Sequence, residues 1–502
     1  MMKIHLIILL ILQIANSEIK NESFKFTTIF EKWIPNSSHL IVHQRLKGIC
    51  FITDSMSGNV VMKEKLLKLN LRGQREWEQL IGEEFYRGML VLSEINSDGI
   101  LDFVLFSGIY DTLADSLKHS ILIIDGKTGA YLSRVTTSLC PYWGLISDRI
   151  GDFDGDGVND GLLLVLANIK LFSLKDGEMI WERDLLSNEE FKKVVPFDVF
   201  PSPSRPVIHY NKNDKNYEAF LTFGPYLWCL NAKTGFIKWR KKEEEDIKYK
   251  EDIRFISEPL IIEWNDKGPP YVISVILLPD LLGFNKVAVC AYNALTGENI
   301  WKTYLNEYPG WWLEAKINHF YFSDIPVLVL VVEGSDDIFM IEGKKGFLIY
   351  REKLPFSVSS YSIVNVDSDS LPEIIFLGSA DLFPSKKQSG MCKSLFIYDI
   401  KPDRFNKKIF AKDRKYDLVP EDPYELLPTH IKEYYSDLKQ IYKSCIPDLS
   451  LILRYDADEN FEFQFVDDID GDGFVEVIML TPPSNEKDQK LRLLRIIPVS
   501  DK

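Results

Sequence analysis

The chain has 502 residues, of which 46% are apolar, and it carries a net charge of −15 at neutral pH. This apolar content is ample for a large buried core, and the length fits either several domains or one large repeat fold. The sequence contains no basic stripe, so nucleic acid is disfavoured as a partner.

Residues 1–17 have the order of a secretory signal peptide. Lys3 supplies the charged start, an apolar run extends from His5 to Ile14, and small residues end the segment at Ser17. The apolar run is too short to span a bilayer, which takes about 20 residues. We therefore predict export to a secretory compartment, and the alternative is that residues 1–17 stay as a membrane anchor.

The stretch 18–45 is expected to be an exposed N-terminal segment. Signals for asparagine glycosylation begin at Asn21 and Asn36, and each has a serine two positions later. These signals fit a chain that passes through the secretory pathway. We predict that the mature protein begins near Glu18 and carries glycan on Asn21 or Asn36.

A nine-residue acidic pattern occurs four times along the chain. It places side chains with oxygen atoms at positions 1, 3, 5 and 9 of a tight loop, with glycine or serine at position 6. The candidate ligands are Glu94, Asn96, Asp98 and Asp102 in a first variant copy, Asp152, Asp154, Asp156 and Asp160 in a complete copy, Asn365, Asp367, Asp369 and Glu373 in a second variant copy, and Asp468, Asp470, Asp472 and Glu476 in a second complete copy.

These loops have the chemistry of a calcium site. Ca²⁺ takes about 6–8 oxygen ligands, and a glycine permits the sharp turn that gathers them. Each copy leads into a short apolar run, which indicates a buried strand rather than the helix of an EF-hand. We predict structural Ca²⁺ in these loops, and the alternative is that acidic turns simply join strands.

A second repeat alternates with the acidic loops. Its clearest copies read Asn-Ala-Lys-Thr-Gly-Phe-Ile-Lys-Trp, ending at Trp239, and Asn-Ala-Leu-Thr-Gly-Glu-Asn-Ile-Trp, ending at Trp301. Each is a β-hairpin whose final aromatic side chain is expected to pack between repeats. The turn glycines are Gly58, Gly129, Gly177, Gly235, Gly297 and Gly346, with a weaker turn near residue 401. Seven turns at intervals of roughly 50 to 70 residues predict an all-β fold, a single seven-bladed β-propeller over residues 46–498.

Residues 403–448 interrupt this repeat. They combine basic residues with prolines, followed by apolar residues at helical spacing between Leu427 and Tyr442. We predict an insertion with one helix. It either decorates the rim of the propeller or binds a partner.

Six cysteines in an exported chain favour disulfide bonds. Cys392 and Cys445 flank a polar stretch and are the first candidate pair. Cys229 and Cys290 occupy similar places in adjacent repeats and are the second. The wide spacing supports neither a zinc ribbon nor a redox motif.

The two repeats resemble known propeller families. The hairpin unit that ends in tryptophan resembles the blades of pyrroloquinoline-quinone-type enzymes, and the acidic loops resemble the calcium loops of FG-GAP propellers. Together, over roughly residues 46–498, the chain resembles the animal membrane glycoproteins called "family with sequence similarity 234". That resemblance implies an extracytoplasmic propeller without a settled activity, although this chain has no obvious internal membrane anchor.

The predicted function is a non-catalytic interaction module. Quinone-dependent enzymes resemble this chain in their hairpins, but they need an adjacent cysteine pair that the sequence lacks. We predict a monomeric, secreted or luminal propeller that is stabilised by Ca²⁺, has no catalytic residue and no organic cofactor, and binds a protein or carbohydrate on one face. The alternative is an enzyme of the quinoprotein-like type that works at the central axis.

Overall fold

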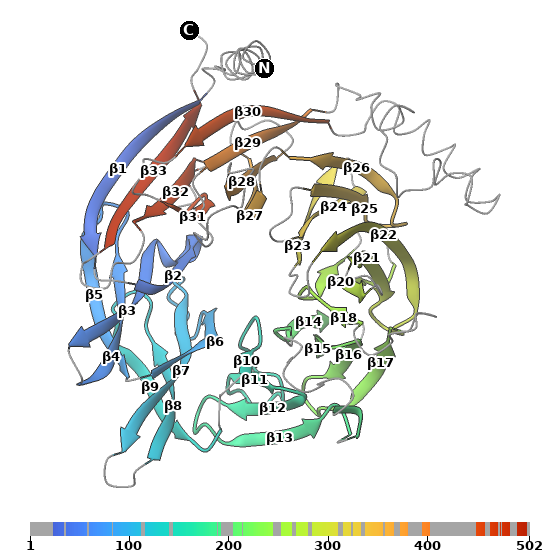
Figure 1. Ribbon diagram of the computed structural model, residues 1–502. Helices are drawn as coiled ribbons and strands as arrows, with labels where there is room; N and C mark the ends of the chain where they lie inside the picture. Colours follow the sequence, from blue (N-terminus) through green and yellow to red (C-terminus); the bar gives the residue numbers. More distant parts are fainter. Residues whose placement is uncertain are drawn as a thin grey trace, which may run out of the picture.

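Eight antiparallel sheets form a ring around a central axis in the computed structural model (Figure 1). The structure describes residues 24–498 apart from several gaps, the larger of which are 192–203, 244–252, 380–393, 402–447 and 482–488, with shorter ones in loops. In each sheet the strands follow one another outwards from the axis. The chain is therefore a β-propeller, and each sheet is one blade.

The first four blades come from the N-terminal half. Blade 1 consists of β2 (Ser37–His43), β3 (Gly48–Ser57), β4 (Val60–Leu69) and β5 (Arg75–Gly82), and blade 2 of β6 (Glu84–Ser93), β7 (Asp102–Asp111), β8 (Ser116–Ile124) and β9 (Tyr131–Thr137). Blade 3 consists of β10 (Gly144–Ile146), β11 (Asp160–Val165), β12 (Asn168–Ser173) and β13 (Met179–Asp184), and blade 4 of β14 (Val207–Asn211), β15 (Asn216–Phe223), β16 (Tyr226–Asn231) and β17 (Ile237–Lys242).

The other four blades follow the same plan, with two short strands sharing the innermost place in blade 5. Blade 5 consists of β18 (Arg254–Phe255), β19 (Leu260–Ile262), β20 (Tyr271–Pro279), β21 (Phe284–Asn293) and β22 (Asn299–Pro309), and blade 6 of β23 (Ala315–Phe322), β24 (Ile325–Val332), β25 (Asp337–Glu342) and β26 (Leu348–Lys353). Blade 7 consists of β27 (Ser357–Val364), β28 (Glu373–Ser379), β29 (Ser394–Lys401) and β30 (Asp448–Asp456), and blade 8 of β31 (Glu462–Asp467), β32 (Val475–Leu480), β33 (Gln489–Pro498) and β1 (Phe24–Ile34).

The predicted count of seven blades is wrong, because the ring has eight. Six of the seven predicted turns lie between the third and fourth strands of blades 2 to 7. Gly58 instead lies between β3 and β4, the second and third strands of blade 1, whose turn from the third to the fourth strand contains Gly73. Blade 8 has no such turn, since its third strand, β33, lies at the C-terminal end and its fourth strand, β1, comes from the N-terminal end. A count of turns therefore falls one short of the number of blades.

The stretch 18–45, expected to be an exposed segment, supplies two propeller strands from residue 24 on. β1 runs antiparallel to β33, from the pair Phe24–Pro498 to the pair Ile34–Gln489. Across this seam Glu31 forms ion pairs with Lys490 and with Arg492, whose Nε lies 2.7 Å from a carboxylate oxygen. The two ends of the chain thus close the ring in one blade.

Helical structure is slight in the part of the chain that the structure describes. It comprises the 3₁₀ turn η1 (Gln44–Leu46) and a single turn at 189–191. The predicted insertion, 403–448, lies outside the described residues except for Asp448, which is already the first residue of β30. No described helix is both long and apolar enough to cross a bilayer.

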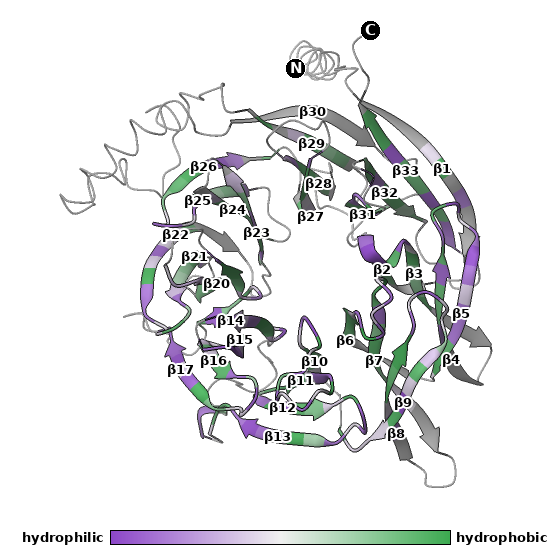
Figure 2. Ribbon diagram, turned by 180° about the vertical axis from the view of Figure 1, so that it is seen from behind, coloured by the Kyte–Doolittle hydropathy of each residue, from purple (hydrophilic) through white to green (hydrophobic). Residues whose placement is uncertain are grey.

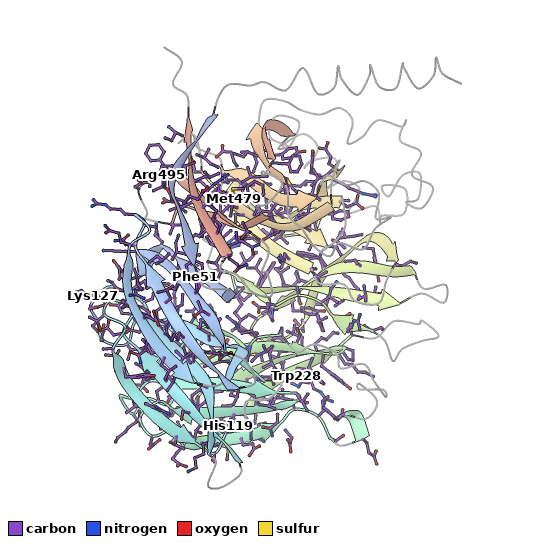
Figure 3. All side chains as sticks on the ribbon, turned by 60° about the vertical axis from the view of Figure 1, so that its left-hand side comes forward. Phe51, His119, Lys127, Trp228, Met479 and Arg495 are labelled. Atoms are coloured by element: carbon purple, nitrogen blue, oxygen red, sulfur yellow. The ribbon has the colours of Figure 1, made fainter. Side chains whose placement is uncertain are left out.

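The core is built from the middle strands of neighbouring blades. Figure 2 shows apolar residues along these strands, whereas outer strands such as β13 and β17 carry many hydrophilic residues. Phe51, Trp228 and Met479 are fully buried and lie within the strands of three different blades (Figure 3). Burying a large apolar side chain contributes about 1.5–3 kcal/mol, so stacking of successive blades is the main source of stability.

The tryptophans at the ends of the hairpins lie between blades, as predicted. The indole N–H groups of Trp181, Trp239 and Trp301 each donate to a backbone carbonyl in the turn of the next blade, over 3.2, 2.8 and 3.2 Å. The turn glycine packs against the same ring: a Cβ atom on Gly235 would stand 2.7 Å from Trp181. The φ angle of Gly235 is also +65°, which a side chain would strain. The aromatic residue and the glycine thus form one inter-blade contact.

Candidate metal centre

The acidic loops and the glycine turns lie at the same end of the blades. Each acidic loop joins the first and second strands of its blade, and the turns of Gly129, Gly177, Gly235, Gly297 and Gly346 each join the third and fourth. Because neighbouring strands are antiparallel, both connections fall at one edge of the sheet. In blade 3, for example, Asp160 after the loop pairs with Ser173 at the start of the turn. The two sequence repeats therefore form a single surface, which we call the acidic-loop face.

The loop of blade 3 brings three carboxylates together. One oxygen each from Asp152, Asp154 and Asp156 lies within 4.8 Å of the others. The loop is shaped by hydrogen bonds from its own backbone: Asp152 accepts from Gly155 at 2.6 Å and from Gly157 at 3.0 Å. Both glycines have positive φ angles, 84° and 87°, which glycine adopts without strain. This cluster can supply oxygen ligands to a hard cation.

Asp160, the fourth predicted ligand of this loop, is fully buried at the start of β11. Its Oδ2 accepts hydrogen bonds from the N–H groups of Phe153 at 3.0 Å and Asp154 at 3.3 Å. Its Oδ1 is buried and has no hydrogen-bond partner among the described residues. Burial, together with the charges of Asp154 and Asp156, raises the pKa of this carboxyl to about 6 against the opposing backbone hydrogen bonds. Leaving a buried charged oxygen without a partner costs about 1–3 kcal/mol or more.

No described basic residue forms an ion pair with any of these four aspartates. Lys233, in the turn of blade 4, stands beside the loop: a Cβ atom on Gly155 would lie 3.5 Å from its Nζ. The blade 3 loop thus gathers negative charge without a paired cation.

The blade 2 loop is arranged differently. Glu94 at its first position forms an ion pair with Arg45 of η1 in blade 1. Asn96 donates its side-chain amide to Asp125 of the adjacent turn at 3.2 Å. Asp98 is exposed and accepts a hydrogen bond from the backbone of its own loop at 2.9 Å. Two of the predicted ligands therefore bond to side chains of other segments.

The blade 8 loop holds an arginine. Arg495 of β33 places Nη1 2.8 Å from Asp472 and Nε 2.7 Å from Glu476. Asp468 lies at the end of β31, whereas Asp470 is outside the described residues. In the blade 7 loop Asn365 and Glu373 flank Asp367 and Asp369, and these two aspartates are also outside the described residues.

The acids at the ninth position share a structural role. Asp102, Asp160, Glu373 and Glu476 are all fully buried at or next to the start of the second strand of their blade. Asp102 accepts hydrogen bonds from two N–H groups of its own loop at 2.9 and 3.3 Å, as Asp160 does, and Glu476 accepts one at 2.9 Å. Asp102, Asp160 and Glu476 thus hold the backbone of their loops in place, a role that the sequence did not indicate.

A fifth buried acid, Glu218 in blade 4, escaped the sequence analysis. It pairs with Asn231 at the start of its turn, as Asp160 pairs with Ser173. The sequence separation between Glu218 and Asn231 is the same as the separation between Asp160 and Ser173. Spacing from the turn, rather than the acidic pattern itself, is the signal that would have found Glu218.

The predicted disulfide between Cys229 and Cys290 is wrong, since neither of these two buried cysteines is part of a disulfide bond. They lie in β16 and β21, in the middle of neighbouring blades. Packed sheets are about 10 Å apart, whereas the Cβ atoms of a disulfide lie about 3.5–4.5 Å apart. Corresponding positions in stacked blades are therefore too distant to bridge. Cys392, Cys445, Asn21 and Asn36 all fall outside the described residues.

A small charged group lies beside the innermost strands of blades 3 to 5. Asp148 accepts a hydrogen bond from the N–H of Ile208 at 2.8 Å. Burial raises the pKa of the Asp148 and Glu258 carboxyls, and the charge of Arg205 opposes that rise in both. The Nε of Arg205 is buried without a hydrogen-bond partner among the described residues. An enzyme active site at the central axis, the alternative prediction, would be built on these three side chains.

Comparison with known proteins adds no family. No protein-family model matches the chain, and no curated protein matches it. Among solved structures the chain is similar to Sqt1 of Saccharomyces cerevisiae, with 12% identity over 70% of this chain and 95% of that one and a TM-score of 0.41. It is also similar to the β-propeller domain of Cps50 (Swd1) of Myceliophteria thermophila, with 9% identity over 70% and 96% of the two chains and a TM-score of 0.34. The V. cholerae biofilm matrix protein Bap1 shows 10% identity over 97% and 90%, with a TM-score of 0.34.

Proposed function

We propose that the chain is a non-catalytic, calcium-stabilised propeller of the FG-GAP and quinoprotein-like type. It is exported to the secretory lumen or beyond, or held at a membrane by residues 1–17, and as a monomer it binds a protein or carbohydrate on one face. The observation that carries the calcium proposal is the blade 3 loop. There three carboxylates converge within 4.8 Å and no described basic residue forms an ion pair with them. A buried oxygen of Asp160 also has no hydrogen-bond partner in the part of the chain that the structure describes.

The proposed cation is structural rather than sensory. Carboxylates a few ångströms apart repel one another strongly in a partly buried loop, and a divalent cation removes that repulsion. The loop leads directly into β11, whose residues 160–164 are all buried. Loss of the cation is therefore expected to loosen a blade, unlike a sensor that swings a pair of helices.

Chelation of calcium should lower the melting temperature of the purified protein by a few degrees. A site filled at one hundred times its dissociation constant contributes about 2.7 kcal/mol to the free energy of unfolding. Asp154→Ala should remove much of the response to chelator. Asp176→Ala is the matched control, because Asp176 also accepts a backbone hydrogen bond in blade 3, at 3.1 Å, but lies outside the cluster. An identical melt with and without chelator would refute structural calcium.

Ligand binding is assigned to the loops, where sequence varies without disturbing the strands. The insertion 403–448 is the element we propose to bind the partner, because it combines basic residues with apolar residues at helical spacing. Deleting residues 405–443 should leave a folded, calcium-responsive propeller that no longer retains its partner in pull-downs from the extracellular or luminal fraction. Full retention by the deletion variant would contradict this assignment.

The second candidate function is an enzyme at the central axis. The group of Asp148, Arg205 and Glu258 is the specific observation that favours it, because carboxyls with raised pKa beside an arginine suit proton transfer. Titration with pyrroloquinoline quinone, followed by its absorbance, separates the two proposals. Stoichiometric binding would favour the enzyme, and no binding would remove the quinoprotein reading.

A further inference from the structure

We propose that two connections of the acidic-loop face carry their own cation. Arg495 in blade 8 and Lys238 in blade 4 occupy the place that a divalent ion would take, and so they exclude calcium there. The inference deepens the proposed calcium site of blade 3 and rests on it. It follows from a comparison of the same structural position in three blades.

In blade 8 the guanidinium bridges two acids of the pattern. Arg495 binds Asp472 at the fifth position and Glu476 at the ninth, over 2.8 and 2.7 Å. Arg495 also pairs in register with Glu476 across β32 and β33, and it lies 5.7 Å from the centre of the Phe474 ring. Strand pairing therefore fixes the guanidinium in the loop. A calcium ion that used the same oxygens would meet an uncompensated positive charge at close range.

In blade 4 a lysine of the fourth strand, Lys238 of β17, likewise bridges two acids. The Nζ of Lys238 lies 2.5 Å from Glu218 and 2.8 Å from Asp214 in the preceding loop. Asn211 donates to the same oxygen of Glu218 at 2.9 Å. Arg495 comes from the third strand of its blade and Lys238 from the fourth. Two separate positions thus supply one positive charge to the buried acid in blades 4 and 8, whereas Asp102 of blade 2 accepts hydrogen bonds from backbone N–H groups on both of its oxygens.

Blade 3 has neither side chain. Ser173 pairs with Asp160 in β12, where Arg495 pairs with Glu476 in blade 8. Ile180, three residues after the turn glycine, stands where Lys238 stands in blade 4. No described lysine or arginine forms an ion pair with Asp160, whereas Glu476 and Glu218 each have one. One buried oxygen of Asp160 has no hydrogen-bond partner among the described residues, as is also true of Oε2 of Glu218. The blade 3 loop is therefore the one of these three that needs a cation from solution.

The experiment counts calcium ions bound per chain by isothermal titration calorimetry on the intact protein. Arg495→Gln should bind one more ion than the wild type, because it frees the acids of the blade 8 loop. Arg495→Lys, which keeps a charge, should match the wild type. Arg492→Gln is the matched control: Arg492 lies on the same strand, but its partner is Glu31 of β1. Conversely, Ile180→Lys should bind one ion fewer than the wild type.

The outcomes separate this inference from the proposed function. A gain by Arg495→Gln supports the inference even if the wild type binds no calcium, a result that would refute the blade 3 site alone. A folded Arg495→Gln that binds no extra ion overturns the inference, whatever the wild type binds. If Arg495→Gln does not fold, Ile180→Lys decides, because its position is already exposed. Retention of all calcium by Ile180→Lys then overturns the inference.

Discussion

Deletion of residues 24–34 should abolish cooperative folding of the whole propeller. These residues form β1, which hydrogen-bonds to β33 along the full length of both strands. Each backbone hydrogen bond contributes about 1 kcal/mol net, so the ladder contributes on the order of several kcal/mol. A domain is stable by only about 5–15 kcal/mol, and the deletion also exposes the edge of β33 to aggregation.

Circular dichroism with heating tests this expectation. The deletion variant should show no sharp thermal transition, and a synthetic peptide of residues 24–34 should restore one in part. Removal of residues 18–23 alone is the control and should leave the melt unchanged. A cooperative melt within a few degrees of the wild type would show that seven blades hold together without the closing strand.

Lys238→Met should lower the free energy of unfolding by about 2–3 kcal/mol. The substitution leaves Glu218, whose side chain is 1% exposed, without its cation. Breaking a fully buried ion pair costs about 3–5 kcal/mol, and we expect the lower part of that scale because the lysine itself is 25% exposed. Adding Glu218→Gln should recover much of the loss, since a neutral amide needs no counter-charge.

Lys170→Met is the matched control for this prediction. Lys170 is similarly exposed, at 22%, and pairs with Glu182 over 3.0 Å, but its partner is itself 39% exposed. Removing such a surface pair should cost no more than about 1 kcal/mol. Denaturation in urea measures both variants. Equal losses for the two lysines would show that the burial of Glu218 carries no special penalty.

The fold class was predictable because its signals are local. Hairpin turns with glycine and tryptophan recur along the chain, and Trp239 and Trp301 pack between blades as expected. The number of blades was not predictable in this way. The third and fourth strands of blade 8, β33 and β1, come from opposite ends of the sequence, so no hairpin turn joins them. Strand pairing over such a distance depends on the closure of the ring, which no short motif encodes.

In the candidate site too, local contacts were predictable from the sequence and contacts between distant strands were not. Sequence spacing placed the three clustered aspartates of blade 3 in one loop, and the structure brings their oxygens together. It did not indicate that Arg495 enters the blade 8 loop, because that residue comes from a later strand. It also missed Glu218, because Asp214 keeps the fifth position of the acidic pattern but Tyr210 and Lys212 stand at the first and third. Charge compensation across strands is visible only once the register is known.

The closing strand also sets when the protein can fold. β1 leaves the ribosome before its partner β33, which begins at Gln489 after all the other strands of the ring. Domains of newly made chains emerge at about 5–20 residues per second, so β1 waits on the order of half a minute or more for its partner. Throughout that time an unpaired strand is available to other chains. Ring closure must therefore wait until β33 has been made, although the strands of the other seven blades are already present.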